Sequence, residues 1–376
     1  MRGRYLVQST AGYLYLKTLD ALLNARVRQS PDKPRIIHRL LLGVGGHLGD
    51  AIVATALLPE INRILPGVEV GVAVPSWAWA AFDGHPSVRW MHRVDHWKMN
   101  RSNSSRFVKL VRFLKTHVRA LAEIRDVDYD AAIDLYPYYP NIAVLLERAG
   151  IPMRIGYESG GGGPAYTQSM SWPDDATHMA VKQLRLLAQT TGGLMAVPVY
   201  DLPPLSDDDS QSATRLLRES GMNEGYAVLH PGTGNPTKAW PLANWLSVAK
   251  SLVEAGLRVA VTGAGTQERE GANWLCTNQP GVVNLVGRTN VGQLRAIFRG
   301  ASLVVASDSA ACHLAAAEKA PLVTIMAGIS YPDEWKPLSE LGVVLTENDG
   351  SLTVKAVNAA AMLLLREPTN ARATAV

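Results

Sequence analysis

The sequence contains little cysteine and no long apolar run. Two cysteines, Cys276 and Cys312, among 376 residues exclude a disulfide framework, and no Cys/His spacing suggests a zinc site. Apolar runs such as residues 40–44 and 303–306 are far shorter than the roughly 18 residues that a membrane-spanning helix needs. Residues 1–8 also lack the pattern of a secretory signal. We therefore expect a globular protein that stays in the cytoplasm.

Charge is nearly balanced over the whole chain but is unevenly placed along it. The 37 Lys and Arg against 33 Asp and Glu give a net charge of +4, and 47% of the residues are apolar. Residues 1–40 carry eight basic side chains against two acidic ones, and residues 89–125 carry ten against two. This asymmetry suggests an anionic partner for the N-terminal half. No feature points to nucleic acid.

From residue 35 onward, short apolar runs alternate with stretches of helical periodicity, which is typical of parallel sheets joined by crossover helices. Two such series predict an α/β fold with two Rossmann-like domains whose parallel sheets face a central cleft. The expected parts are a basic N-terminal extension (1–34), a first domain (35–197), a Pro- and Asp-rich linker (198–209), a second domain (210–350), and a closing helix with a tail (351–376).

The first candidate site is the Gly-rich turn at residues 45–50. Glycines let the backbone approach a ligand, and the single helix predicted over residues 50–65 offers free N–H groups. The turn does not match the dinucleotide fingerprint G-x-G-x-x-G. Asp50 is either an acid–base residue or a helix N-terminal residue favoured by the helix dipole.

A second candidate site is the loop at residues 230–241, which combines glycines and hydroxyls with one lysine. The hydroxyls of Thr233 and Thr237 and the backbone N–H groups can hold phosphate oxygens, and Lys238 supplies a point charge. The alternative is an ordinary loop with a solvated lysine.

A third candidate site follows the apolar run 303–306. Asp308 and Ser309 stand at the predicted start of a helix, and His313 lies one turn further. The carboxyl end of a strand in an open α/β sheet is a usual ligand position. The alternatives are a simple helix cap for Asp308 and Ser309 and a packed core position for His313.

In their order and spacing these motifs resemble glycosyltransferase family 9, the heptosyltransferases of lipopolysaccharide core assembly, from about Arg35 to Pro337. The resemblance implies a GT-B fold. The matching segments are Gly49-Asp50, Asp130–Leu135, Arg154–Tyr157, His230–Gly232, Lys238–Pro241, Thr262–Gly265, Asn284–Thr289, Asp308-Ser309, His313-Leu314 and Trp335–Pro337.

The resemblance implies an inverting transfer of a sugar, with a heptose from ADP-heptose as the first candidate. By position, Asp50 would be the catalytic base that takes the proton from the acceptor hydroxyl. Lys238, with Thr233 and Thr237, would neutralise the leaving diphosphate. The family also implies that no metal ion or other cofactor is used, and this sequence has no DxD motif.

The remaining implied roles concern the donor. Asp308, Ser309 and His313 would line the donor site, and Glu268 would bind the nucleotide ribose. One departure lies in this region: the family usually has a glycine where this sequence has Ala310. The added methyl group would crowd a phosphate drawn close to the backbone.

The expected acceptor is an anionic glycolipid or another glycan, and a basic helix predicted over residues 107–121 is the candidate surface for it. Its basic residues recur every three residues and are interpreted as one helical face that holds the acceptor or anionic lipid: Arg106, Lys109, Arg112 and Lys115. Residues 1–34 lie outside the family pattern. They are interpreted either as a peripheral membrane anchor or as an extra helix packed on the first domain. Peripheral contact with the inner membrane is therefore expected.

Two other classes of function stay open. A GT-B transferase could use another donor with a capsule or natural-product acceptor, and a non-catalytic relative could only bind a nucleotide sugar. Nucleotide-sugar epimerases need a dinucleotide fingerprint together with a Tyr-x-x-x-Lys pair, and this sequence lacks that fingerprint.

Overall fold

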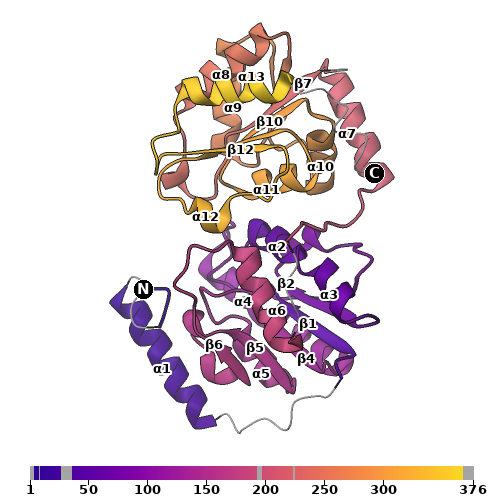
Figure 1. The fold of residues 1–376 in the computed structure, drawn as a ribbon, viewed down its shortest axis with the longest axis vertical. Coiled ribbons are helices and arrows are strands. Elements are labelled where there is room, and N and C mark those ends of the chain that lie inside the picture. Colours follow the sequence, from indigo (N-terminus) through magenta and orange to yellow (C-terminus); the bar gives the residue numbers. More distant parts are fainter. Residues whose placement is uncertain (1–3, 8, 27–35, 193–196, 223–224, 367–376) are drawn as a thin grey trace. The chain divides into compact units, whose positions relative to one another are not determined.

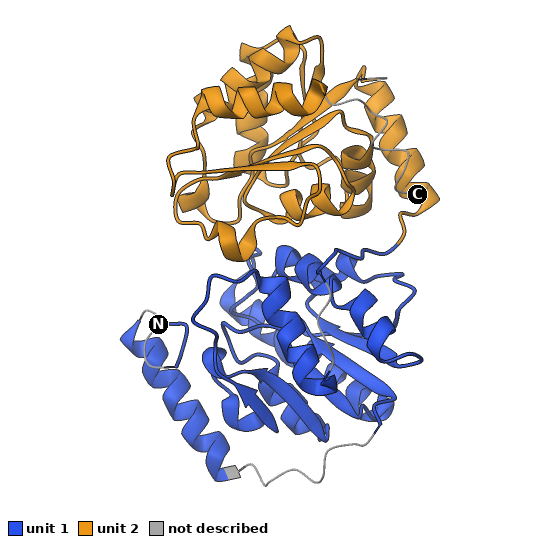
Figure 2. Cartoon of the chain, viewed as in Figure 1, with its two compact units in different colours: residues 1–203 blue, residues 204–376 orange. Residues whose placement is uncertain are grey.

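Each of the two units of the chain is built on one parallel β-sheet of six strands (Figures 1 and 2). The units comprise residues 1–203 and 204–376 in the computed structural model. The residues that the structure describes are 4–7, 9–26, 36–192, 197–222 and 225–366. Parts of the predicted N-terminal extension, first domain and tail therefore lie outside the described residues.

The sheet of the first unit has the order β3-β2-β1-β4-β5-β6, and every neighbouring pair is parallel. Its strands are β1 (Arg39–Gly43), β2 (Glu69–Val74), β3 (Val88–Arg93), β4 (Ala131–Asp134), β5 (Met153–Tyr157) and β6 (Gln168–Met170). Its helices are α1 (Thr10–Arg26), α2 (Leu48–Thr55), α3 (Leu58–Ile64), α4 (Arg106–Val127), α5 (Ala143–Ala149) and α6 (Met179–Thr191), with 3₁₀ turns η1 (Ser76–Ala81), η2 (Glu158–Gly160) and η3 (Gly163–Ala165). Helix α4 packs on α5, and α2 packs on α6.

The sheet of the second unit has the order β12-β11-β10-β7-β8-β9 and is also parallel throughout. Its strands are β7 (Tyr226–His230), β8 (Arg258–Val261), β9 (Val282–Asn284), β10 (Leu303–Ser307), β11 (Leu322–Met326) and β12 (Gly342–Thr346). Its helices are α7 (Asp207–Glu219), α8 (Leu242–Glu254), α9 (Thr266–Asn278), α10 (Val291–Gly300), α11 (Ala310–Ala317), α12 (Pro332–Trp335) and α13 (Val354–Arg366), with the 3₁₀ turn η4 (Pro236–Lys238).

Two groups of helices pack within the second unit, α8 with α9 and α13, and α10 with α7 and α11. Every residue of β10 and β11 is buried, as expected for central strands of a parallel sheet that helices cover on both faces. Val357 and Ala361 of α13 belong to the core around Trp245. The predicted closing helix is thus an integral part of this unit.

The predicted α/β class with two parallel sheets is confirmed. The single helix predicted over residues 50–65 is wrong, because the chain forms α2 and α3 there with Pro59 in the first turn of α3. Proline has no N–H group and cannot continue a helix from the preceding turn. Helix α7 begins at Asp207, inside the segment expected as a linker.

Strands β3, β6 and β12 have no counterpart among the expected strands. All three are edge strands of their sheets, and each carries partly exposed positions. An edge strand does not need the continuous apolar run that marks a central strand, so its sequence signal is weak.

Helix α1 packs on the first unit through a buried carboxylate. The two Asp20 oxygens accept hydrogen bonds from Arg4 Nη2 at 2.6 Å, from Tyr5 Oη at 2.8 Å and from the Gly162 backbone N–H at 2.7 Å. Asp20 is buried, as are Leu16 and Leu23 on the same side of the helix. Of the two interpretations of the N-terminal extension, its described part shows the packed helix.

Candidate functional site

In each unit the predicted site residues follow strands at the point where the strand order reverses. In the first unit β1 lies between β2 and β4, and in the second unit β7 lies between β8 and β10. Open α/β sheets bind ligands beyond the carboxyl ends of strands at this switch point. Asp50 follows β1, Lys238 follows β7, and Asp308 follows β10.

Asp50 is the third residue of α2 and closes the turn that precedes this helix. Its Oδ2 accepts a hydrogen bond from the His47 backbone N–H at 2.7 Å. A Cβ atom on Gly46 would lie 2.5 Å from Asp50 Cγ, so only glycine leaves room for the carboxylate. The half-buried carboxylate is therefore both a helix-terminal group and a fixed group in the turn.

Side chains from three other segments hold this turn. Trp77 Nε1 donates to the Gly46 carbonyl at 3.0 Å, and Asn141 Nδ2 donates to the Gly45 carbonyl at 2.9 Å. His47 Nε2 lies 3.1 Å from the Met99 carbonyl. Burial, then the charge of Arg101, lowers the pKa of His47 to about 4. Its ring is neutral at pH 7, with Nε2 as the donor.

Tyr136 and Arg101 add to the electrostatics of this site. Burial raises the pKa of Tyr136, and the Asp50 charge raises it further, whereas Arg101 lowers it. Tyr136 therefore keeps its proton near the Asp50 carboxylate. Sequence reasoning did not single out Tyr136, Arg101 or Asn141. The one available signal was that Tyr136 and Asn141 follow the strand predicted at residues 131–135, which becomes a neighbour of β1.

A buried carboxyl group stands at the carboxyl end of β4, paired in register with Gly43 of β1. Asp134 Oδ2 accepts from Tyr166 Oη at 2.9 Å, and Oδ1 accepts from the Tyr136 N–H at 3.0 Å. Burial raises the pKa of Asp134 to about 7 despite these bonds. Asp134 thus titrates near neutral pH at the end of the strand beside β1.

This pKa predicts how stability depends on pH in an Asp134→Asn variant. The folded state holds the proton more tightly than the unfolded chain, whose Asp pKa is about 3.9. The stability that Asp134 contributes is therefore complete below about pH 4 and falls as pH rises towards 7. Asparagine has no charge to bury, so the free energy of unfolding of the variant minus that of the wild type should increase across this window. Guanidinium unfolding at a series of pH values measures the difference.

Histidines such as His47 and His96, whose pKa values burial lowers to about 4, titrate in both proteins and cancel in this difference. They destabilise the fold as pH falls from about 6.5 towards 4, in the direction opposite to Asp134. A difference that does not change between pH 4 and 7 would contradict the assignment for Asp134.

In the second unit the loops after β7 and β10 are joined by an ion pair. Lys238 Nζ lies 2.6 Å from Asp308 Oδ2, with 8% of the Asp308 side chain and 25% of the Lys238 side chain exposed. Thr233 Oγ1 donates to the Asp308 carbonyl at 3.4 Å, and Ser307 Oγ donates to the Pro231 carbonyl at 2.9 Å. The structure thus brings together three of the predicted donor residues.

The other donor candidates lie along the same edge of the sheet. Ser309 is the N-cap of α11, and its Oγ accepts from the Ala311 N–H at 3.3 Å. Ala310 follows as the first residue of this helix and is half-exposed, whereas His313 is buried. The carboxylate of Glu268 accepts from the Ala264 N–H.

Two glycine contacts show how closely these loops approach one another. A Cβ atom on Gly232 would lie 2.5 Å from Glu268 Oε1, so the Glu268 carboxylate rests on the loop after β7. A Cβ atom on Gly328 would clash with the Thr237 carbonyl, and Gly328 has φ +59°. Gly328 was missed by sequence reasoning, although a glycine soon after an apolar strand is a visible signal. It lets the chain after β11 pass beneath Thr237 and Lys238.

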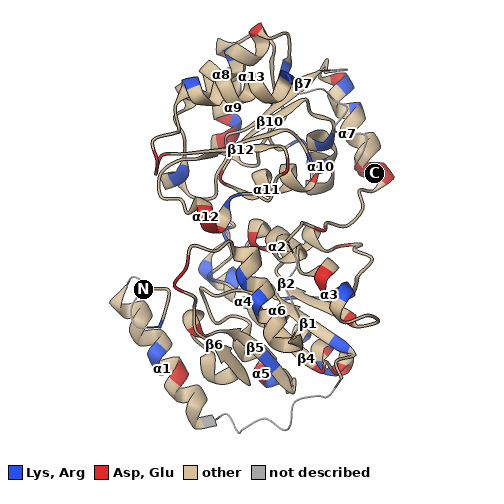
Figure 3. Ribbon diagram, in the orientation of Figure 1, with Lys and Arg blue, Asp and Glu red and all other residues tan. Residues whose placement is uncertain are grey.

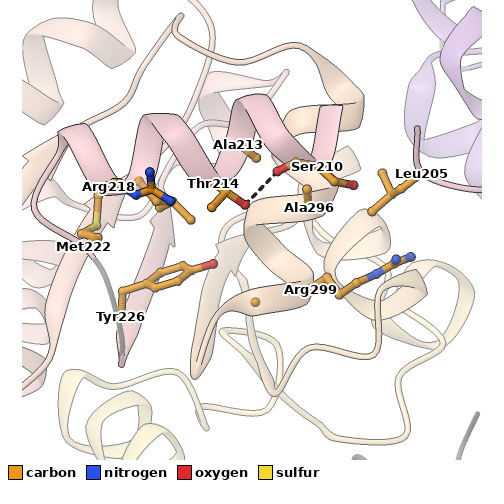
Figure 4. Close-up of a pocket in the computed structure, with 11 residues that line it drawn as sticks. Leu205, Ser210, Ala213, Thr214, Arg218, Met222, Tyr226, Ala296 and Arg299 are labelled. Carbon is orange, nitrogen blue, oxygen red and sulfur yellow. Dashed lines mark hydrogen bonds between the residues drawn. The ribbon is translucent and has the colours of Figure 1, made fainter. Parts of the chain in front are cut away.

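A separate cavity of about 510 Å³ in the second unit is not part of this site (Figure 4). It lies between α7 and α10, with Ser210 and Thr214 on one side and Arg299 on the other. Tyr226, the first residue of β7, also lines it. The cavity is therefore at the amino end of β7, whereas the predicted donor residues lie beyond its carboxyl end.

The four basic residues proposed for the acceptor lie on α4, where Lys and Arg recur along the helix (Figure 3). At 3.6 residues per turn, each step of three residues rotates the side chain back by about 60°. The set from Arg106 to Lys115 therefore spreads over about half of the circumference instead of one narrow face. Lys109 is half-buried, and the other three are exposed.

Membrane-spanning helices and metal-binding clusters are both absent from the residues that the structure describes. Within those ranges, no helix is long and apolar enough to cross a membrane. In the same part of the chain, no group of three or more His, Cys, Asp or Glu side chains is arranged to hold a metal ion.

Comparison with known proteins identifies the family. Residues 118–361 match the model for glycosyltransferase family 9 (heptosyltransferase). Lipopolysaccharide heptosyltransferase 3 of Escherichia coli is 22% identical over 308 residues, which cover 77% of this chain and 84% of that protein. The structure of E. coli ADP-heptose lipopolysaccharide heptosyltransferase II matches with a TM-score of 0.71 at 20% identity, covering 87% of this chain and 98% of that one.

E. coli heptosyltransferase WaaC with ADP matches with a TM-score of 0.69 at 19% identity, covering 87% and 99% of the two chains. These structural similarities confirm the GT-B fold class predicted from the motifs. The family model spans well over half of the sequence, including the segments that contain Lys238, Glu268 and Asp308. The chain belongs to glycosyltransferase family 9.

Proposed function

We propose that this protein is an inverting transferase that moves a heptose from ADP-heptose to a hydroxyl of a lipopolysaccharide-core glycolipid. The observation that carries the proposal is the Lys238–Asp308 pair at the switch point of the second unit, because it fixes an ammonium group where α/β sheets bind phosphates. The relatives named as lipopolysaccharide heptosyltransferases support the acceptor, and the relative solved with ADP supports the nucleotide.

In the proposed reaction Asp50 removes the proton of the acceptor hydroxyl as its oxygen attacks the anomeric carbon. The bond between that carbon and the diphosphate oxygen breaks on the opposite side, so the configuration inverts and the nucleoside diphosphate leaves. Its growing negative charge is stabilised by Lys238, by the hydroxyls of Thr233 and Thr237, and by the N-terminus of α11. In this scheme the lysine and the helix dipole take the place of a divalent cation.

The other donor residues receive narrower roles in the proposal. Asp308 orients Lys238, Ser309 presents the start of α11 to phosphate, and His313 packs beneath that start. Glu268 accepts hydrogen bonds from the ribose hydroxyls. Ala310 adds a methyl group at the first residue of α11, so the phosphates sit slightly further from this backbone than a glycine would allow.

The acceptor is proposed to be anionic, because exposed Lys and Arg side chains spread over about half of the circumference of α4 in the first unit. The exposed side chains of Arg106, Arg112 and Lys115 can contact phosphate groups from several directions. The half-buried Lys109 adds positive charge beside them. Arg101, which precedes α4 in the sequence, adds a positive charge that lowers the pKa of both His47 and Tyr136 at the Asp50 turn.

A thermal-shift screen against ADP-, GDP-, UDP- and dTDP-sugars tests the donor. A ligand at 100 times its dissociation constant should stabilise the protein by about 2.7 kcal/mol, and we expect this from ADP-heptose first. Product formation with a lipopolysaccharide-core acceptor then tests transfer. Stabilisation by another nucleotide sugar alone would favour a different donor with a capsule or natural-product acceptor. Stabilisation by ADP-heptose without any transfer would favour a non-catalytic binding protein.

A further inference from the structure

The outward side of α4 exposes a stripe of large apolar side chains. The exposed fractions are 74% for Phe107, 41% for Leu110, 52% for Leu114 and 66% for Val118. Their spacing of three, four and four residues places them along one line of the helix. A monomeric globular protein rarely leaves such a row in water unless the row serves for binding.

Basic residues border this stripe, and acidic residues are missing from it. Arg106 and Lys115 are exposed on either side of the apolar line, Arg112 and Arg119 are exposed further round the helix, and residues 106–122 contain no Asp or Glu. An apolar row flanked by Lys and Arg is the pattern of a helix that lies in the surface of an anionic bilayer.

Helix α1 repeats the pattern outside the region matched by the family model. Leu14, Tyr15 and Leu22 are 55%, 51% and 57% exposed. The one acidic residue of α1, Asp20, is buried on the opposite side, where it is paired with Arg4. The buried contacts of Asp20 fix the helix so that Leu14 and Leu22 point away from the unit, with Tyr15 at the edge of this side.

The two helices border one aromatic cluster, so they lie in one region of the first unit. The Tyr15 ring of α1 stacks on Tyr139 with centroids 6.3 Å apart. The ring centroid of Tyr139 lies 5.0 Å from that of His96, and the His96 centroid lies 4.7 Å from that of Phe113 in α4. Lys98 Nζ is 4.5 Å from the centroid of the Tyr139 ring and adds a cation there.

We propose that the outward sides of α1 and α4 together form a contact surface for an anionic lipid bilayer, held by apolar insertion as well as by charge. A second copy of the chain fits this surface poorly, because self-association would bring two basic surfaces together. The inference rests on the proposed function only for the presence of a lipid-borne acceptor, which such a surface would keep within reach of the first unit.

Co-sedimentation of the full chain with vesicles tests this surface. Phosphatidylethanolamine–phosphatidylglycerol vesicles should bind the wild type, and phosphatidylcholine vesicles should bind it much less. The variant Phe107→Ser/Leu114→Ser/Val118→Ser should bind the anionic vesicles at least about tenfold more weakly, because each lost side chain removes apolar burial. Leu14→Ser/Leu22→Ser should weaken binding in the same direction, and Phe107→Trp should retain it.

Matched controls separate this effect from a general loss of surface apolarity. Trp274 and Leu363 are exposed apolar residues of the second unit, and Trp274→Ser/Leu363→Ser should bind like the wild type. Added salt should weaken the binding of the wild type without abolishing it, because salt screens only the ionic part.

Three outcomes would overturn the proposal. One is equal vesicle binding by the wild type and the Phe107/Leu114/Val118 variant, which would leave a purely ionic contact. Another is no binding of the wild type to anionic vesicles. The third is a dimer in analytical ultracentrifugation that the same variant dissociates, which would make a second copy the occupant. The vesicles contain no glycan acceptor and no nucleotide sugar, so failure of the proposed transfer and failure of this surface give separate results.

Discussion

An Asp50→Ala variant should lose about 10²- to 10⁴-fold in turnover while its affinity for the donor nucleotide stays nearly unchanged. A general base contributes a factor of this size in the transition state and makes no contact with the bound nucleotide in the ground state. Turnover measured with saturating donor and acceptor, together with titration of the nucleoside diphosphate, separates the two quantities.

Asp50 also has a structural role at the start of α2, and the alanine variant loses this role together with the acid–base group. Its Oδ2 accepts the His47 N–H in the turn before α2, so alanine also weakens a helix start, by about 1 kcal/mol. Asp50→Asn is the sharper variant, because its amide oxygen can keep that hydrogen bond but cannot take a proton. We expect it to fold like the wild type and to be nearly as inactive as the alanine variant.

Gln293 offers a matched control. It is the third residue of α10, and its Oε1 accepts the N-cap Asn290 N–H at 3.0 Å, which repeats the capping role of Asp50 without an acid. Gln293→Ala should lower stability by a similar amount and leave turnover unchanged. Wild-type turnover in Asp50→Asn would reduce Asp50 to a helix-terminal residue.

The central strands of both sheets could be predicted because one constraint, burial on both faces of the sheet, determines which residues they contain. Leu40–Gly43 and Leu303–Ser307 are buried throughout, and strands covered on both faces must be apolar along their whole length. The hydroxyl and acidic residues that follow them then stand at known positions relative to the sheet. For this reason Asp50, Lys238 and Asp308 could be placed at strand ends from the sequence alone.

The partners of these residues could not be predicted, because they depend on which strands become neighbours. Asn141 reaches the Gly45 carbonyl only because β4 lies beside β1, and Gly328 reaches Thr237 only because the chain after β11 returns to the loop after β7. Trp77 donates to Gly46 from a 3₁₀ turn that has no periodic signal. Such contacts are set by strand order, which local sequence patterns leave open.

A Lys238→Ala variant should bind nucleoside diphosphate roughly 10- to 100-fold more weakly and should also turn over more slowly. A hydrogen bond to a charged group contributes about 1.5–3 kcal/mol, and the leaving group gains charge as the glycosidic bond breaks. Calorimetric titration of the nucleoside diphosphate, with turnover at saturating donor, measures both effects. Lys250→Ala, which removes an exposed lysine from α8, is the matched control and should change neither.

The ion pair with Asp308 complicates the single variant, because removal of Lys238 leaves the buried Asp308 carboxylate unpaired at the proposed diphosphate site. That carboxylate would repel a diphosphate whether or not the lysine ever touched it. The double variant Lys238→Ala/Asp308→Asn removes both charges and isolates the contact of the lysine with the nucleotide. If Lys238 holds the diphosphate, the double variant should still bind it at least several-fold more weakly than the wild type. Full recovery of affinity and turnover would mean that Lys238 only neutralises Asp308, and the leaving-group role would then have to pass to the hydroxyls and the start of α11.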